Sequence, residues 1–467
     1  MLAMILVLQQ LRGLWLDEAA SYWLSRHDVG WLQLARERWI TDVHPPLFSM
    51  LSWAARPLLG ESIQHLRMIN LAGLLFALMV WRRAAESGLD GFFLASFGLA
   101  VAASPFFILY AAEFRSYFLQ MVLSASLVVL FRMVVEGRGG MGWLSATLLL
   151  LTNLHYYGCL SGLILVGVGT LYLRRQGRGR EALTLCLSIL VSLLPLVMAM
   201  LAMISSIEPV KVSYASPVAG VLMVVLVGLS PAMPNIALLY AIGRARKRRD
   251  ALSDLSILLA LACGLTVAAY ALLNLFTHNL LPRHMISVIP IAAGLLASLA
   301  ERELRRDPRL FRLSCYNAVL LSAAAFSYGL THSRWESNVT LIKAALRQCP
   351  ASPVYALNGM SLVGAEDPLH RVAGINDVFA LTYQLIARRA GWRVVIVPDG
   401  QMHRPHRGCP SLLWIEHFYA RQRLRDEQLA RLAGFTQDLS VARLQSGGGR
   451  ALLAISQAPP NPPLPSR

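Results

Sequence analysis

Charged side chains are scarce in this sequence of 467 residues. They make up 15% of the chain, whereas hydrophobic residues make up 56%. Soluble domains carry about 25% charged residues, so the chain lacks the polar surface that a soluble protein of this length requires. The deficit argues against a soluble protein and predicts a chain that is largely embedded in a membrane.

Lysine is almost absent, because the 43 basic residues include only Lys211, Lys247 and Lys343. The net charge of +17 comes from arginines that gather in short runs between apolar segments, as at residues 244–249 and 302–312. No basic run is interleaved with aromatic residues in a soluble module, which excludes nucleic acid as a partner. Basic runs beside apolar segments follow the positive-inside rule instead.

The features of a cleavable signal peptide are also lacking. Residues 1–16 are apolar, but no basic segment opens them and no small-residue cleavage site stands before residue 17. Signal peptides carry both features. We therefore expect residues 1–16 to be retained as a short first span.

Apolar segments near the length that a helix needs to cross a bilayer, about 20 residues, recur up to residue 330. They predict a polytopic α-helical membrane protein, with residues 1–330 as its transmembrane module. The basic residues at the segment ends place the N-terminus in the cytoplasm and the loop at residues 17–64 outside. The expected transmembrane helices, about eleven in number, are residues 1–16, 65–81, 91–111, 116–135, 141–157, 159–173, 182–204, 217–242, 254–276, 284–300 and 313–330.

Residues 331–457 differ because their apolar runs are short and separated by polar turns. Strand and helix patterns alternate, which predicts an extracytoplasmic α/β domain. The domain has no glycine-rich phosphate loop and no metal-ligand spacing, and residues 458–467 form a proline-rich tail expected to be disordered. The expected strands are 353–357, 392–398, 411–415 and 450–455, and the expected helices are 376–390 and 420–435.

Cysteine is limited to six residues, of which only Cys349 and Cys409 lie in the segment expected outside the cell. Each is followed by proline and then by a predicted strand. If those strands are parallel neighbours, about 4.8 Å apart, the two cysteines meet the Cα separation of a disulfide. Two unpaired thiols on separate loops are the alternative.

Acidic residues stand out in the polar stretch between the first two apolar segments. Asp17 and Glu18 form a pair, and residues 42–47 read Asp-Val-His-Pro-Pro-Leu, with Asp42 and His44 two positions apart. A membrane protein seldom places carboxylates and a histidine beside its spans without using them. The alternative is a solvated loop that happens to be acidic.

Further ionisable residues lie at the expected outer ends of other spans. Glu113, Arg115 and Tyr117 follow the third span, His155 closes the fifth, and Arg283 opens the tenth. On a regular helix Glu113 and Arg115 would point about 200° apart, so each would need another partner. A guanidinium can bind phosphate through two parallel hydrogen bonds, which makes Arg283 a candidate phosphate clamp.

Three patterns together resemble a known family: Trp-Leu-Asp-Glu-Ala at residues 15–19, Asp-x-His-Pro-Pro-Leu at 42–47, and Tyr-x-x-Glu-x-Arg-x-Tyr at 110–117. The chain resembles the GT-C glycosyltransferases, in particular their bacterial PMT/ArnT-like branch, over roughly residues 10–300. The resemblance implies a GT-C fold and an inverting transfer of a hexose or pentose from a polyprenyl-phosphate donor. The acceptor would be a glycan, lipid or protein at the outer face of the bacterial cytoplasmic membrane, among membrane lipids.

The resemblance also implies roles for single residues. Asp17 corresponds to the catalytic base, with Glu18 beside it. A divalent metal held by Asp42 and His44 is an alternative, and no other cofactor is expected. The runner-up function is a transporter or flippase of lipid-linked sugars, whose ionisable residues would lie near the bilayer midplane. His44, Arg115 and Arg283 would bind the donor phosphate, and Asp42, Glu113, Tyr117 and His155 would support them.

Overall fold

The computed structural model describes residues 1–40, 42, 44–206, 218, 220, 222, 225–226, 235–247, 253–277, 280–331, 336, 338–357, 374–397, 409, 411–416, 439–446 and 449–456. The chain forms two compact units. The first comprises Met1–Leu11 and Leu24–Gly329, and the second comprises Arg12–Trp23 and Leu330–Arg467. The composition changes at residue 331, beside the start of the second stretch of this unit at Leu330. No sequence signal predicted that Arg12–Trp23 would belong to the second unit.

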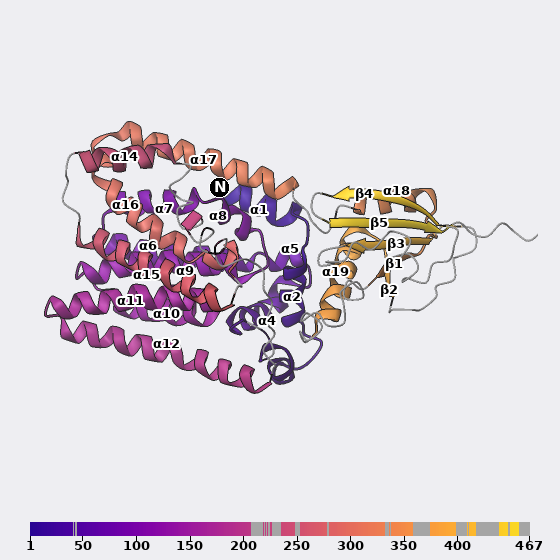
Figure 1. The fold of residues 1–467 in the computed structure, drawn as a ribbon, viewed down its shortest axis with the longest axis horizontal. Coiled ribbons are helices and arrows are strands. Elements are labelled where there is room, and N and C mark those ends of the chain that lie inside the picture. The colour runs from indigo at the N-terminus through magenta and orange to yellow at the C-terminus, as the bar shows by residue number, and fades with distance from the viewer. Residues whose placement is uncertain are drawn as a thin grey trace, which may run out of the picture. The chain divides into compact units, whose positions relative to one another are not determined.

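Long apolar helices build the first unit (Figure 1). Among the described residues, six are long and apolar enough to cross a membrane, and the protein is a polytopic α-helical membrane protein. A bent pair, α7 (Gly91–Ala102) and α8 (Pro105–Ala111), forms a seventh span broken by 73°. Proline at the first position of α8 marks the break. The six are Ile63–Glu86, comprising α5 (Ile63–Leu66) and α6 (Ile69–Glu86), α9 (Ser116–Val135), α11 (Tyr156–Arg175), α12 (Gly179–Ser206), α15 (Asp254–Thr277) and α17 (Pro308–Thr331).

The other four expected spans do not meet that length and apolarity in the described part of the chain. Helix α1 (Leu2–Leu11) has 10 residues, and α10 (Met141–Leu154) has 14. Helix α16 (Val288–Arg306) has 19 residues, but its last two turns are rich in Glu and Arg. Half of 217–242 lies outside the described residues, and the described half includes the start of α14 (Ile236–Lys247). Seven of the eleven expected spans therefore meet this test among the described residues, and the count of eleven stays a prediction.

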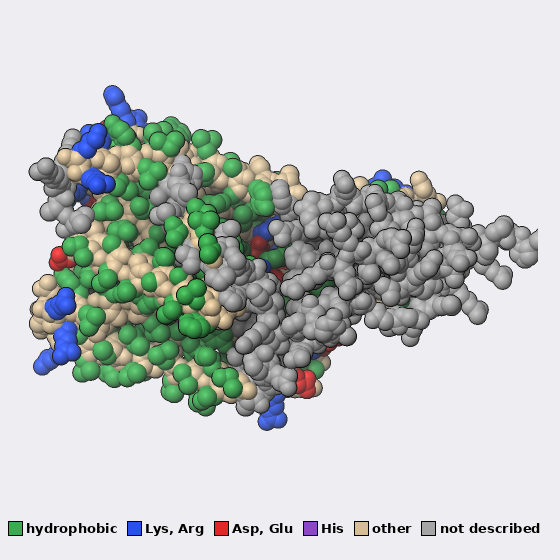
Figure 2. Space-filling view, viewed as in Figure 1, with side chains coloured by type: hydrophobic (Ala, Val, Ile, Leu, Met, Phe, Trp, Pro, Cys, Tyr) green, Lys and Arg blue, Asp and Glu red, His purple; other side chains and the backbone are tan. Residues whose placement is uncertain are grey.

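Helix α9 is the core of the first unit, because its side chains are buried along almost its whole length. Glycines let neighbouring helices approach it closely. A Cβ on Gly169 of α11 would lie 2.6 Å from the ring of Phe131, and one on Gly294 of α16 would lie 2.8 Å from Val128. Small residues at such contacts are typical of membrane helices, which pack without a hydrophobic driving force between them. Outward-facing leucines cover the surface instead, as on α12 (Figure 2).

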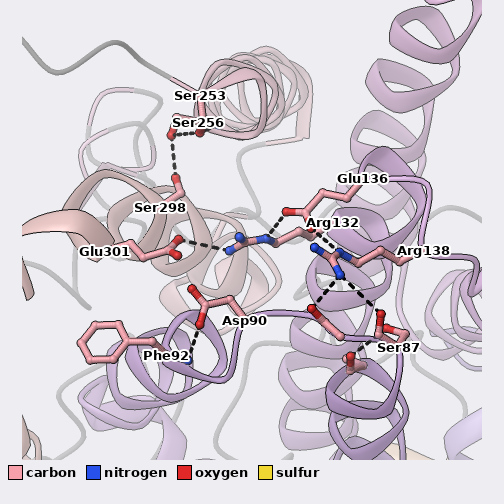
Figure 3. A network of polar contacts seen from close by, with 12 residues as sticks. Ser87, Asp90, Phe92, Arg132, Glu136, Arg138, Ser253, Ser256, Ser298 and Glu301 are labelled. Atoms are coloured by element: carbon pink, nitrogen blue, oxygen red, sulfur yellow. Dashed lines mark hydrogen bonds and ion pairs between the residues drawn. The ribbon is translucent and has the colours of Figure 1, made fainter. Parts of the chain in front are cut away.

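An ionic network ties the C-terminal ends of α9 and α16 together (Figure 3). Arg132 of α9 pairs with Glu136 at 2.6 Å and with Glu301 of α16 at 3.3 Å. Arg305 bridges from Glu301 to Asp90, which precedes α7. Cations in the last turn of a helix are favoured by the helix dipole, so the network stabilises these helix ends as well as joining them.

The polar stretch after α1 folds into short helices. Arg38 donates two hydrogen bonds to the carboxylate of Asp28, at 3.0 and 2.8 Å. The indole of Trp39 donates to the carbonyl of Leu24 at 2.8 Å. These contacts organise the segment that leads to His44. The helices are α2 (Leu16–Leu24), α3 (Trp31–Leu34), the π-helix η1 (Ala35–Trp39) and α4 (Leu47–Leu59).

The second unit contains a five-stranded mixed sheet in the order β2-β1-β3-β5-β4. β1 (Val354–Leu357) is parallel to both β2 (Val394–Val397) and β3 (Ser411–Glu416), as expected for an α/β arrangement. β5 (Gly449–Ser456) runs antiparallel to β3 and to β4 (Leu439–Ser446). Trp414 of β3 is fully buried against Tyr383 of α19 (Ile375–Ala390), with ring centroids 4.9 Å apart.

Four expected strands and the helix at 376–390 correspond to β1, β2, β3, β5 and α19. Strand β4 and helix α18 (Val339–Gln348) were not predicted. The helix expected at 420–435 and the tail at 458–467 lie outside the described residues. Cys349 and Cys409 form a disulfide with Cα atoms 5.9 Å apart, at the beginnings of the parallel neighbours β1 and β3.

Candidate functional site

Three long helices of the first unit begin close to one another. The residues that cap their N-termini are Arg115 for α9, His155 for α11 and Ser287 for α16. The ring of His155 lies 5.7 Å from that of Tyr117 in α9 and 5.9 Å from that of His284. Each helix N-terminus carries a partial positive charge, so this end of the bundle favours an anion before any side chain is considered.

Buried amides hold the turn that leads into α9. Asn70 of α6 donates from its side chain to the carbonyl of Glu113 at 2.7 Å. Gln9 of α1 donates to the carbonyl of Ala111 at 2.8 Å. Glu113 and Arg115 therefore lie in a turn between α8 and α9, outside both expected spans, so the 200° separation of a regular helix does not apply to them.

His155 occupies the break between α10 and α11. Its backbone is extended (φ −163°, ψ 137°), and its Nδ1 accepts a hydrogen bond from the backbone N–H of Tyr157 at 3.3 Å. A neutral imidazole that accepts at Nδ1 carries its proton on Nε2. That Nε2 is buried and has no hydrogen-bond partner among the described residues. The side chain is only 2% exposed, so His155 lies inside the site and not at a solvated membrane boundary.

Positive charge surrounds His155. Burial, followed by the charges of His44, His284, Arg115 and Arg283, holds the pKa of His155 well below its usual range. Of these four basic side chains, His44 and His284 have rings 5.3 and 5.9 Å from that of His155. Three of them, His44, Arg115 and Arg283, are the residues that the sequence assigned to the donor phosphate. Since a neutral His155 can still donate from Nε2, it adds a hydrogen bond to the cluster without adding charge.

His44 and Asp42 lie together in the first loop, shortly before α4. Nδ1 of His44 is 3.4 Å from Oδ1 of Asp42, and the ring of His44 is 5.3 Å from that of His155. Across the described residues, no three His, Cys, Asp or Glu side chains are placed to hold a metal ion together. Asp42 and His44 would supply two protein ligands, fewer than the three or four of most zinc sites.

Several residues of the site escaped the sequence analysis. His284 stacks on Tyr157 with ring centroids 4.9 Å apart. Below them, Tyr270 donates to the carbonyl of Tyr157 and hydrogen-bonds Ser287 at 2.9 Å. Gln120 of α9 donates to Ser287 at 3.2 Å. A buried glutamine and serine within apolar segments were the available signal, because polar side chains inside a membrane span seldom lack a role.

Asp17 and Glu18 belong to the second unit. Both lie in the first turn of α2, where acidic side chains are favoured by the helix dipole. Glu18 is fully buried, and Asp17 is partly exposed. Ser21 donates to the backbone carbonyl of Asp17 at 3.3 Å. Of the remaining predicted residues, Arg115 donates to the hydroxyl of Tyr117 at 3.3 Å, and Arg283 lies in the 3₁₀-helix η2 (Pro282–Met285) before α16.

Two solved structures share the fold of the whole chain. One is ArnT from Cupriavidus metallidurans in the apo state, with a TM-score of 0.55 and 15% identity over 97% of this chain and 96% of that one. The other is the same protein bound to undecaprenyl phosphate, with a TM-score of 0.54 and 16% identity over the same shares of the two chains. The fold is therefore that of ArnT, as the resemblance in the sequence predicted. No protein-family profile and no curated protein matches the sequence.

Proposed function

We propose that the protein is a glycosyltransferase that moves a sugar from a polyprenyl-phosphate carrier to an acceptor at the outer face of the cytoplasmic membrane. The observation that carries the proposal is the gathering of basic side chains where three long helices begin. The ring of His44 lies 5.3 Å from that of His155. Arg115 donates to Tyr117, whose ring is 5.7 Å from His155, and Arg283 precedes His284, whose ring is 5.9 Å away. Such a site suits a phosphate group, because helix N-termini, guanidinium groups and imidazoles all stabilise anionic oxygens.

A phosphate bound at this cluster would be stabilised as the leaving group of the reaction. When the bond between the anomeric carbon and the phosphate oxygen breaks, negative charge accumulates on the polyprenyl phosphate. Fixed donors aimed at that charge lower the barrier, since they are already oriented before the bond breaks. Arg115 and Arg283 supply charge, and Nε2 of His155 supplies a neutral donor. The likeness to ArnT, of which one structure holds undecaprenyl phosphate, supports this class of donor.

Asp17 completes the proposed mechanism as general base. Its carboxylate accepts the proton of the acceptor hydroxyl while that oxygen attacks the anomeric carbon, and the phosphate leaves from the opposite face. One displacement inverts the configuration of the sugar. Glu18 would support Asp17, and Asp42, Glu113 and Tyr117 would support the residues that hold the phosphate.

The outer face is proposed from the charges at the two ends of the bundle. α9, α11 and α16 begin at the candidate site and carry Arg132, Arg174 and Arg305 in their last turns. A helix of 20 residues spans about 30 Å, which is the thickness of the hydrocarbon core. Arginine-rich ends lie in the cytoplasm under the positive-inside rule, so the site would lie on the other side.

The test uses the purified protein in vesicles with polyprenyl-phosphate sugars as donors. Turnover is measured as the release of polyprenyl phosphate. We expect Asp17→Asn to lower kcat by about 10²–10⁴-fold, since it cannot accept a proton. Arg283→Gln should raise the KM for the donor by about 10–100-fold, because a hydrogen bond to a charged group contributes about 1.5–3 kcal/mol.

The control is Arg82→Gln, since the side chain of Arg82 is 82% exposed and pairs with Glu86. Wild-type turnover by Asp17→Asn would refute the role of Asp17 as general base. An unchanged donor KM in Arg283→Gln would refute the role of Arg283 in binding the donor phosphate. Movement of the lipid-linked sugar across sealed vesicles without sugar transfer would favour the flippase. Loss of activity in EDTA would support the alternative that Asp42 and His44 hold a divalent metal.

A further inference from the structure

The segment that carries Asp17 and Glu18 is tied to the C-terminal domain at its first residues. The backbone N–H of Leu14 donates to Oε1 of Glu336 at 2.9 Å. Arg389 of α19 donates to the carbonyl of Arg12 at 3.0 Å and pairs with the same Oε1 of Glu336 at 3.0 Å. Glu336 and Arg389 therefore form a clamp that holds one backbone donor and one backbone acceptor just before α2.

The other end of the segment is held by the opposite end of α19. Gly374 caps the N-terminus of this helix with φ +72°, a conformation that favours glycine. A Cβ at Gly374 would lie 2.3 Å from the indole ring of Trp23, so only glycine allows this approach. Helix α19 thus meets Trp23 with its N-cap residue and Arg12 with its last turn. The helix therefore runs in the opposite direction to the segment and contacts both of its ends.

Helix α2 needs such support because it is short. It has nine residues, and isolated helices of fewer than about 12 residues are marginal in water. The clamp is partly shielded from solvent, since the side chains of Arg389 and Glu336 are 29% and 18% exposed. Contacts to backbone atoms fix the position of the chain and not only that of a side chain. The direction in which α2 starts is therefore set by Glu336 and Arg389.

We propose that Glu336 and Arg389 are positioning residues that hold the helix of Asp17 and Glu18 in its catalytic position. The C-terminal domain would then be part of the catalytic apparatus and not an appendage. The inference rests on the proposed function, because it assumes that Asp17 reacts. A displacement of about 1 Å in a catalytic group can lower the rate on the order of 100-fold, so a small shift of α2 would be measurable.

The experiment uses the full-length protein and compares Arg389→Gln with Arg388→Gln. Arg388 is the exposed neighbour on the same helix and serves as the matched control. Hydrogen exchange of the peptide that covers residues 12–23 should become up to about 10-fold faster in Arg389→Gln, as expected for the loss of one hydrogen bond. The kcat should fall by about 10–100-fold while the KM for the donor stays unchanged. Arg389→Lys keeps the charge beside Glu336 and should recover part of the rate.

The pH profile separates positioning from simple loss of folded protein. A displaced Asp17 has a new environment, so the acid limb of the rate profile should move in Arg389→Gln. Partial unfolding would lower the amplitude and leave the limb in place. Gly374→Ala tests the other end of the segment and should also speed exchange of residues 12–23.

Three results would overturn the inference. Unchanged exchange of residues 12–23 in Arg389→Gln would show that the clamp does not hold the segment. Faster exchange with wild-type kcat and pH profile would show that the held position does not matter for the reaction. Full turnover by Asp17→Asn would refute the base itself, and the exchange measurement, which needs no turnover, distinguishes that failure from an absent clamp.

Discussion

The imidazole of His155 uses its two ring nitrogens for different purposes. Nδ1 caps α11 by accepting from the N–H of Tyr157, and Nε2 is left buried among basic side chains. Capping consumes the lone pair of Nδ1, so the proton stays on Nε2 and a second proton would add charge to an already positive cluster. Local helix chemistry and the proposed phosphate site therefore favour the same neutral tautomer.

We expect His155 to make the fold less stable at low pH. Burial and the nearby cations hold its pKa below the usual value, whereas an unfolded histidine has a pKa of about 6.5. Below that pH the unfolded state binds a proton that the folded state rejects, so the free energy of unfolding falls as the pH falls. Replacing His155 with Asn keeps a capping residue but removes the titration. Thermal unfolding in detergent between pH 7.5 and 5.0 should show a smaller loss of Tm in His155→Asn, and parallel losses would contradict the assignment.

Among the elements, α9 and α11 show how glycine sets the distance between helices. Gly169 faces the ring of Phe131, whereas Gly167 on the same helix has no atom within 4 Å of a built Cβ. The two glycines lie two residues apart in α11 and differ in what a methyl group would meet. Substituting each glycine in turn therefore distinguishes the effect of packing against α9 from the effect of helix propensity.

Substituting Gly169 with Ala should lower the free energy of unfolding by about 1–3 kcal/mol, because an aromatic ring must move to admit the methyl group. Gly167→Ala should be neutral or stabilising by up to about 1 kcal/mol, since alanine favours the helix and meets nothing. Unfolding in detergent micelles measures both. A destabilised Gly167→Ala beside an unaffected Gly169→Ala would place the contact on the other face of α11.

At the scale of the whole molecule, the disulfide offers a way to test on which side of the membrane the second unit lies. Cys349 and Cys409 are 60 residues apart in sequence. Closing a loop of that length contributes about 4 kcal/mol in the chain-entropy account, and disulfides persist in oxidising compartments. The bond thus links the stability of the second unit to its proposed export.

In intact cells, a variant that lacks the other four cysteines should resist maleimide labelling until a membrane-impermeant reductant is added. The labelling is blocked because the two sulfur atoms are bonded to each other, and the reductant reaches them because they lie outside the membrane. Cys349→Ser should expose Cys409 to labelling without reductant and lower the stability of the second unit by about 4 kcal/mol. Labelling before reduction would show free thiols, and protection after reduction would place the domain inside.

Local hydrophobic pattern was sufficient for much of the architecture. The segment predicted at 116–135 coincides with α9, and the strand predicted at 411–415 differs from β3 by one residue. Apolar length and alternation are properties of neighbouring residues, so they can be read without tertiary contacts. The pattern was less reliable where apolar runs were short or mixed, and α18 and β4 were missed.

The sequence by itself determined that the protein lies in a membrane, which long apolar segments form most of its spans, and which polar residues interrupt them. Tertiary structure alone decided which of those polar residues meet. His155 and His284 are distant in sequence, yet their rings lie 5.9 Å apart because α11 and α16 begin at the same end of the bundle. Arg12–Trp23 likewise belongs to the second unit only through tertiary contacts. Glu336 and Arg389 follow that segment by more than 300 residues, and no local pattern encodes a contact made after so long a loop.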